Sequence, residues 1–272
     1  MSGYARPEVL IETDRLEETL DDAGQVIVEV DEDTDAYDKG HIPGAVAINW
    51  KTELHDVPRR DFVSSHQLAE LLRNKGISDN QTIVLYGGNS NWFAAYAYWL
   101  FKLRGVTKVK LLNGGRKKWE LESRPMTRDE QPRTRSRKFT MGKEQPGLRI
   151  LRDELMGKVG ASGGAMVDVR APEEFRGELL APPHLPQEQA QVPGHIPGAR
   201  NIPWGKAANE DGTFKSAEEL KKLYETEGIT ADKDTVAYCR IGERSSHTWF
   251  VLTELLGYPN VRNYDGSWTE YG

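Results

Sequence analysis

A cysteine among charged neighbours is the clearest indication of chemistry in the sequence. Cys239 is the only cysteine of the chain and opens the segment CRIGERS, which also contains Arg240 and Arg244. The thiolate is the nucleophilic form of cysteine, and nearby positive charge favours it. Two guanidinium groups can also bind an anion. A buried structural cysteine is the simpler alternative, but flanking charges and Gly242 are not typical of a core. We therefore expect a reactive Cys239 that handles an anionic ligand.

The segments on either side of Cys239 predict how it is positioned. TVAY before it reads as a short buried strand, and SSHTWFVLTELLG (245–257) reads as a helix. The cysteine would then follow the carboxyl end of a parallel strand, where open α/β sheets bind ligands. It would also face a helix N-terminus, whose free N–H groups and positive dipole end attract anions. The sequence therefore predicts an anion site in the loop 239–245.

The two halves of the sequence repeat the same segments in the same order. GHIPGA occurs at 40–45 and again at 194–199. Three further pairs match: VIVEVD with AMVDVR, TIVLYGG with TVAYCRI, and LRGVTKVKLLNGG with LLGYPNVRNYDGS. Such self-similarity indicates a duplicated domain. Gly87 stands at the position that matches Cys239, so the second copy alone carries the thiol.

Short β-branched runs alternate with helical stretches in each half, which predicts the α/β class. We expect two tandem domains of the same fold, each a parallel β-sheet flanked by helices on both faces. The N-terminal domain is expected over 8–121, a polar linker with three prolines over 122–147, and the C-terminal domain over 148–272.

An insertion over 178–193 distinguishes the C-terminal half. It lies between Asp168 and the second GHIPGA, and its prolines are Pro182, Pro183, Pro186 and Pro193. A loop beside a site can be a lid, a binding wall or plain surface, and the sequence leaves its role open.

The CRIGERS loop resembles the active-site loop of the rhodanese family, and specifically of its two-domain, bacterial-type thiosulfate sulfurtransferases. The resemblance extends from about residue 8 to residue 272 and includes both copies of GHIPGA. Its other motifs are LNGGRKKW, NIPWGKAANEDGTFK and YDGSWTEYG. It implies two similar α/β domains, of which only the C-terminal one is catalytic. Gly87, at the position of the cysteine, agrees with an N-terminal domain that is not catalytic.

The resemblance implies covalent sulfur transfer through Cys239. The thiolate would attack the outer sulfur of thiosulfate, sulfite would leave, and cyanide or a thiol would take the sulfur from the resulting persulfide. Arg244 would be the main substrate-binding residue, assisted by Arg240. The loop N–H groups would cradle the persulfide. Besides Arg240, the residues of this cradle are Ile241, Gly242, Glu243 and Ser245.

Three further residues are candidates for a supporting role. Asp168 ends the first strand of the C-terminal half and could orient Arg244, although a strand-end carboxylate can also cap a neighbouring turn. Trp92 and Phe93 lie in the N-terminal counterpart of the CRIGERS loop. By resemblance they could form an apolar wall near the persulfide, and ordinary packing is the alternative.

Other polar residues in these motifs are expected to be structural. His41 and His195 occur in both GHIPGA copies, including the half without a cysteine, so shaping a turn is favoured over catalysis. Arg170 and Arg176 could reach the anion, but pairing at the surface with acidic neighbours is simpler. Those neighbours are Glu173, Glu174 and Glu178.

Three other functions use, or could use, a loop of this kind. Cysteine phosphatases place five residues between the cysteine and the arginine, whereas RIGE is one residue shorter and makes a smaller cradle. A 3-mercaptopyruvate sulfurtransferase would be similar, but two arginines suit dianionic thiosulfate better than a monocarboxylate. A persulfide carrier for a protein sulfur acceptor, or a peroxide-sensing thiol, would fit the same loop.

Composition excludes several other classes. A net charge of −6 and a pI near 5.6 argue against nucleic-acid partners. The longest apolar run, 92–101, is about half of what a membrane span needs. One cysteine allows no intrachain disulfide and no cysteine-based zinc cluster. We expect no cofactor, no metal, and a cytoplasmic location without a signal peptide.

Overall fold

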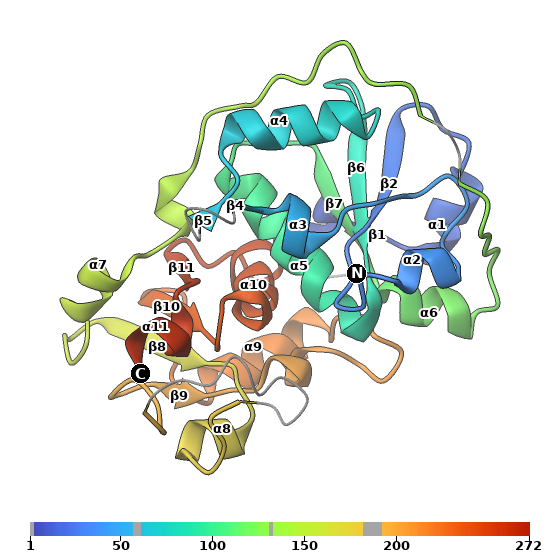
Figure 1. The fold of residues 1–272 in the computed structure, drawn as a ribbon. Helices are drawn as coiled ribbons and strands as arrows, with labels where there is room; N and C mark the ends of the chain where they lie inside the picture. The colour runs from blue at the N-terminus through green and yellow to red at the C-terminus, as the bar shows by residue number, and fades with distance from the viewer. Residues whose placement is uncertain (1–2, 57–60, 131–132, 182–191) are drawn as a thin grey trace. The chain divides into compact units, whose positions relative to one another are not determined.

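The computed structural model describes residues 3–56, 61–130, 133–181 and 192–272 (Figure 1). These residues divide into two compact units. The N-terminal unit holds the described residues of 8–145 and 210–213, and the C-terminal unit holds those of 3–7, 146–209 and 214–272. Three prolines of the expected insertion, Pro182, Pro183 and Pro186, lie outside the described residues.

The N-terminal unit is built on five parallel strands in the order β1, β7, β6, β2, β3. Their bounds are β1 Leu10–Ile11, β2 Gln25–Glu29, β3 Val46–Ala47, β6 Thr82–Tyr86 and β7 Val109–Leu112. Ile27 and Val84 of the central strands share one core with Trp119, while Val28 and Leu85 are fully buried as well. Side chains on both faces of these strands are covered, which explains their continuous apolar runs.

Helices and one antiparallel pair of short strands complete the N-terminal unit. They are η1 (Pro7–Val9), α1 (Thr13–Glu18), α2 (Ala36–Lys39), α3 (Trp50–Glu53), α4 (Ser65–Asn74), α5 (Gly88–Leu103), α6 (Gly115–Leu121) and the antiparallel pair β4 (His55–Asp56) and β5 (Asp61–Phe62). The helix α4 begins with a capping box between Ser64 and Gln67.

The C-terminal unit is built on four parallel strands in the order β11, β10, β8, β9. Their bounds are β8 Gly164–Asp168, β9 Arg200–Asn201, β10 Asp234–Tyr238 and β11 Val261–Tyr264. The helical segments are η2 (Pro146–Leu148), α7 (Arg152–Met156), α8 (Pro172–Arg176), η4 (Trp204–Ala207), α9 (Ala217–Glu225), α10 (Glu243–Phe250), the π-helical turn η5 (Val251–Leu255) and α11 (Ser267–Tyr271). The expected fold is confirmed: both sheets are parallel and flanked by helices on both faces (Figure 1).

The repeated segments make the same contacts in both units. The hydroxyl of Tyr86, at the end of β6, accepts the N–H of Ile42 at 3.1 Å. The hydroxyl of Tyr238, at the end of β10, accepts the N–H of Ile196 at 3.0 Å. Each copy of GHIPGA is thus tied to the central strand of its own sheet.

The segment expected as a linker is hydrogen-bonded to the N-terminal unit along much of its length. Thr127 and His41 exchange two backbone hydrogen bonds, of 2.8 and 2.9 Å. Farther along, Gly142 donates to the carbonyl oxygen of Gly105 at 3.0 Å. This explains why residues up to 145 group with the N-terminal unit.

The first backbone N–H groups of the loop after β6 donate to side-chain oxygens. Gly87 donates its N–H to the Asn91 side-chain oxygen at 3.0 Å, and Gly88 donates to the Asp31 carboxylate at 2.5 Å. Side-chain oxygens therefore accept hydrogen bonds from two backbone N–H groups that could otherwise donate to an anion. A side chain at position 87 would also run into the carbonyl oxygen of Val30.

We expect Gly87→Ala to lower the free energy of unfolding by about 1–3 kcal/mol, because the backbone must shift to admit a Cβ. Gly205→Ala is the matched control, because a Cβ there would meet nothing within 4 Å. Urea denaturation of the two variants provides the comparison. Equal stability of the two would contradict the close approach at Gly87. For the same steric reason, Gly87→Cys is not expected to create a second reactive thiol.

Candidate active site

Hydrogen-bond donors surround the sulfur of Cys239. The residue follows Tyr238 at the carboxyl end of β10, three residues separate it from α10, and it is fully buried. Gly242 donates its N–H to Sγ at 3.1 Å, and the Ser245 hydroxyl lies 3.6 Å from Sγ. Donors at these positions stabilise negative charge on sulfur. The expected placement at a strand end and a helix start is therefore present.

The last helix of the chain holds the loop from outside. The carbonyl oxygens of Cys239 and Arg240 accept the N–H groups of Trp268 and Thr269, each at 3.1 Å. The Ser267 hydroxyl accepts the N–H of Cys239 at 3.1 Å. The start of α11 thus fixes three backbone groups around the cysteine.

Gly242 is the residue that lets the loop turn. Its φ of 100° lies in the left-handed region, which favours glycine. A Cβ on Gly242 would lie 2.8 Å from Cα of Asp265. The turn into α10 therefore requires glycine for both backbone conformation and space.

Arg244 forms a buried, bidentate ion pair with Glu174 of α8. The distances are 2.7 Å from Nη1 to Oε2 and 2.9 Å from Nη2 to Oε1. Burial by itself lowers the pKa of Arg244, but the hydrogen bonds to Glu174 and the electrostatic interactions with Cys239 and Glu174 outweigh it and raise that pKa. The guanidinium is therefore charged.

Asp168 does not orient Arg244, so that expectation is wrong. Its carboxylate binds Arg170, with Nη2 at 2.6 Å and Nε at 3.0 Å, and both side chains are fully buried. Asp168 also accepts the N–H of Arg170 at 3.0 Å, which is the turn-capping alternative. Arg170 donates to Gly194 of the second GHIPGA and lies over the ring of Trp268. This pair braces the end of β8.

Glu174 is the supporting residue that the sequence did not reveal. Surface pairing with Glu173, Glu174 or Glu178 is the expectation for both Arg170 and Arg176. It is confirmed for Arg176, which pairs with Glu178 at 2.7 Å and Glu173 at 3.5 Å. It is wrong for Arg170, which is buried against Asp168. A usable signal was present, since Pro172 marks a helix start just beyond the strand end, and Glu174 lies in its first turn. Ser267, within the YDGSWTEYG motif, was missed as well.

The remaining predicted residues fall into two groups. Arg240, Gly242, Glu243 and Ser245 are buried around Cys239, and Ile241 is partly buried. Trp92 and Phe93 belong to the N-terminal unit, where their rings stack with centroids 5.1 Å apart. Phe93 also packs on Trp50 at 4.6 Å. These contacts are ordinary packing, and the proposed wall near the sulfur stays a prediction.

The two histidines of the repeated motif make matching structural contacts. His41 stacks on Tyr37 with centroids 3.7 Å apart, and His195 stacks on Phe175 at 3.6 Å. In each case Nδ1 lies within 3.0 Å of the carbonyl oxygen of the stacked residue. These contacts support the turn-shaping interpretation.

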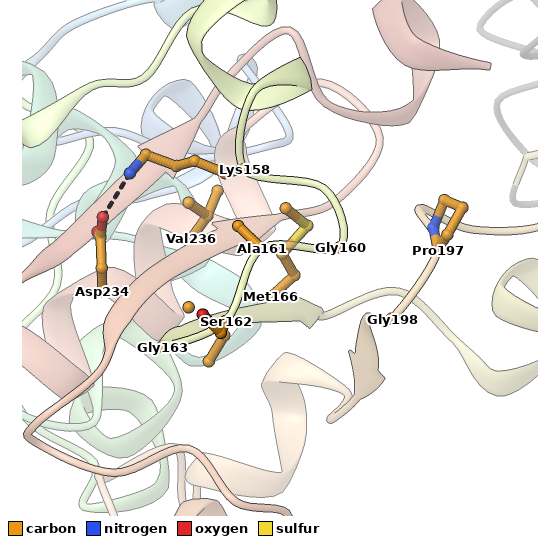
Figure 2. Close-up of a pocket in the computed structure, with 12 residues that line it drawn as sticks. Lys158, Gly160, Ala161, Ser162, Gly163, Met166, Pro197, Gly198, Asp234 and Val236 are labelled. Carbon is orange, nitrogen blue, oxygen red and sulfur yellow. Dashed lines mark hydrogen bonds and ion pairs between the residues drawn. The ribbon is translucent and has the colours of Figure 1, made fainter.

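A cavity of about 310 Å³ lies at the amino-terminal ends of β8 and β10 in the C-terminal sheet. Figure 2 shows Met166, Val236 and Ala161 around it, with the ion pair of Lys158 and Asp234 at its side. Its lining includes the first residues of β8 and β10, whereas Cys239 follows the last residue of β10. The cavity is therefore separate from the candidate active site.

Two further class predictions concern metals and membranes. Across the described ranges, no group of three or more His, Cys, Asp or Glu side chains is arranged to hold a metal ion. No helix in the described part of the chain has both the length and the apolar character needed to cross a membrane.

The buried pair predicts an acid-sensitive contribution to stability. Burial alone raises the pKa of Glu174, but the hydrogen bonds and charge of Arg244 outweigh it and hold that pKa below its ordinary value of 4.5. The folded state therefore binds fewer protons here than the unfolded state. The stabilisation is fully present above pH 4.5 and is lost as the pH falls through the lowered pKa.

We expect Glu174→Gln to lower the free energy of unfolding by about 1.5–3 kcal/mol near neutral pH, because a charged hydrogen bond is lost. This difference from the unmodified protein should shrink below pH 4.5. Chemical denaturation at about pH 7 and about pH 3.5 measures it. Glu173→Gln, on the exposed side of α8, serves as the control. A difference that stays constant with pH would contradict the ion pair.

Comparisons with known proteins agree with this architecture. The family described as "Rhodanese-like domain" matches residues 12–122 and again 151–272. A "Putative thiosulfate sulfurtransferase" of Mycolicibacterium smegmatis is 60% identical over 270 residues, covering 98% of this chain and 96% of that protein. "Sulfur carrier protein TtuD" of Thermus thermophilus is 55% identical over 273 residues, covering 99% and 95%.

Among solved structures, a variant of EanB in complex with ergothioneine is similar, with a TM-score of 0.77 and 27% identity. The match covers 91% of this chain and 62% of the EanB chain, so this chain spans less than two thirds of that protein. Both matched copies, the parallel sheets and the cysteine loop lead to one conclusion: the chain belongs to the rhodanese family and has two rhodanese-like domains.

Proposed function

We propose that this protein is a sulfurtransferase that moves the sulfane sulfur of thiosulfate to cyanide or a thiol through a persulfide on Cys239. The observation that carries the proposal is the sulfur of Cys239, which accepts the Gly242 N–H at 3.1 Å at the start of α10. The name of the relative from Mycolicibacterium smegmatis, "Putative thiosulfate sulfurtransferase", supports the same assignment.

The first half-reaction forms a bond between Sγ and the outer sulfur of thiosulfate. The S–S bond of thiosulfate breaks, and its electron pair leaves with sulfite. The second nucleophile then attacks the terminal sulfur of the persulfide and returns the Cys239 thiolate. Covalent catalysis of this kind divides one transfer into two easier steps.

Each stage places negative charge within the same loop, on Sγ in the thiolate and on the outer sulfur in the persulfide. The N–H of Gly242 and the first free N–H groups of α10 would stabilise that charge. Arg244 adds a guanidinium that is paired with Glu174 and has N–H donors beyond the two that this pair uses. We assign to it, with Arg240 as its neighbour in the loop, the attraction of the sulfonate oxygens of thiosulfate.

A protein-linked role is the second candidate. The relative from Thermus thermophilus is named a sulfur carrier, and it covers nearly the whole of this chain. The same Cys239 persulfide could be handed to a protein acceptor. Turnover with small thiols would support the enzyme, whereas stoichiometric transfer to a protein alone would support the carrier.

The persulfide is tested by intact-mass spectrometry before and after thiosulfate, and again after cyanide. We expect a gain of one sulfur atom that cyanide removes, and no gain in Cys239→Ser, because an alkoxide does not replace a thiolate here. Far-UV circular dichroism of the variant controls for folding. Full activity of Cys239→Ser would refute the mechanism. A gain only with 3-mercaptopyruvate would move the assignment to that donor.

Arg244→Ala should raise the KM for thiosulfate by about tenfold or more, because a charge-assisted contact to the anion is lost. The single variant also leaves the buried Glu174 carboxylate unpaired, which is destabilising. The double variant Arg244→Ala with Glu174→Gln removes that stranded charge and separates the two effects. Steady-state kinetics at varied thiosulfate measures both variants. An unchanged KM in the double variant would exclude Arg244 from substrate binding.

A further inference from the structure

The charge of Arg244 is already matched inside the protein. Both of its terminal nitrogens donate to the Glu174 carboxylate, and both side chains are more than nine-tenths buried. A carboxylate is thus built into a site whose ligands are anions. Its presence needs a reason, because a buried pair of this kind is weak evidence for a gain in stability.

Glu174 is held in place independently of the arginine. Its Oε2 accepts the N–H of Ala171 at 3.1 Å, within a capping arrangement at the start of α8. Pro172 begins the helix directly after that residue. The carboxylate is therefore positioned by the backbone of α8 and reaches Arg244 of α10 from there.

We propose that Glu174 limits the affinity of the active site for sulfur oxyanions by neutralising Arg244. This inference rests on the proposed sulfur transfer, in which thiosulfate must bind and sulfite must leave. An unpaired guanidinium beside the sulfur would hold both dianions strongly. The paired guanidinium still offers N–H donors, but the pair of Arg244 and Glu174 has no net charge. Glu174 is thus a positioning and specificity-determining residue that favours sulfite release.

The charges around the guanidinium support this assignment. Besides Glu174, the groups that interact electrostatically with Arg244 include Cys239 and Glu243. Cys239 is occupied by sulfur chemistry during turnover, whereas Glu174 makes the two direct hydrogen bonds. Removing the charge of Glu174 should therefore have the largest effect on how strongly the site holds an anion.

The variant Glu174→Gln removes the charge with little change of shape. A glutamine oxygen can still accept the Ala171 N–H, since capping arrangements accept Glu or Gln at this position, and it can keep one hydrogen bond to Arg244. Glu173→Gln is the matched control, because it makes the same charge change one residue away at the surface, where Glu173 pairs with Arg176. Glu174→Asp keeps the charge on a shorter side chain.

The first measurement is sulfate binding to the resting protein by isothermal titration calorimetry, with sulfate as a dianion that does not react. We expect Glu174→Gln to bind sulfate about tenfold more tightly, a change in the range of one charge-assisted contact. Glu173→Gln and Glu174→Asp should stay within about twofold of the unmodified protein. Structural damage alone would weaken binding, so a gain in affinity is diagnostic.

The second measurement is product inhibition by sulfite in thiosulfate-to-cyanide turnover. In Glu174→Gln the inhibition constant for sulfite and the KM for thiosulfate should both fall, while kcat does not rise. Unchanged or weaker sulfate binding by folded Glu174→Gln would overturn the proposal, as would an equal gain in Glu174→Asp. If the unmodified protein forms no persulfide with thiosulfate, the proposed sulfur transfer fails, and the sulfate measurement still decides the role of Glu174.

Discussion

The turn that leads from β10 into α10 is the constraint on which the candidate active site depends. The sulfur of Cys239 accepts the N–H of Gly242 across this turn, while α11 holds the carbonyl oxygens of Cys239 and Arg240 from outside. Gly242 must adopt a left-handed conformation against the backbone of Asp265. Because one short turn sets the thiol, the helix N-terminus and Arg244 together, a change at any of these points alters the others.

Two buried ion pairs support that turn, and they are separate. Asp168 binds the arginine two residues after it and braces the end of β8, whereas Glu174 reaches Arg244 from α8. Removing one partner of such a pair strands a charge in the interior. The pair at β8 fixes the frame, and the pair with Arg244 adjusts the charge beside the sulfur. Asp168 thus has a structural role, and Glu174 has an electrostatic one.

The N-terminal domain has the same frame but no cysteine at the matching position, which is Gly87. Its strand-end tyrosine, Tyr86, holds the first GHIPGA as Tyr238 holds the second. In the loop, however, Gly87 has no room for a side chain, and the amides of Gly87 and Gly88 donate to Asn91 and Asp31. A fold can therefore be preserved while its anion site is closed by the chain's own oxygens, which agrees with the rule that function belongs to sites and not to folds.

The sequence by itself determined the duplication, the α/β class and the position of Cys239 between a strand and a helix, because these follow from repeated segments and local periodicity. The resemblance of the CRIGERS loop to the rhodanese family pointed to Gly242 and the other loop donors. The partner of Arg244 could not be found in this way. Asp168 and Glu174 both precede the loop by some seventy residues, and only the folded chain shows which carboxylate meets Arg244. Pairing across elements depends on the depth and direction of each side chain, and tertiary packing alone decides these.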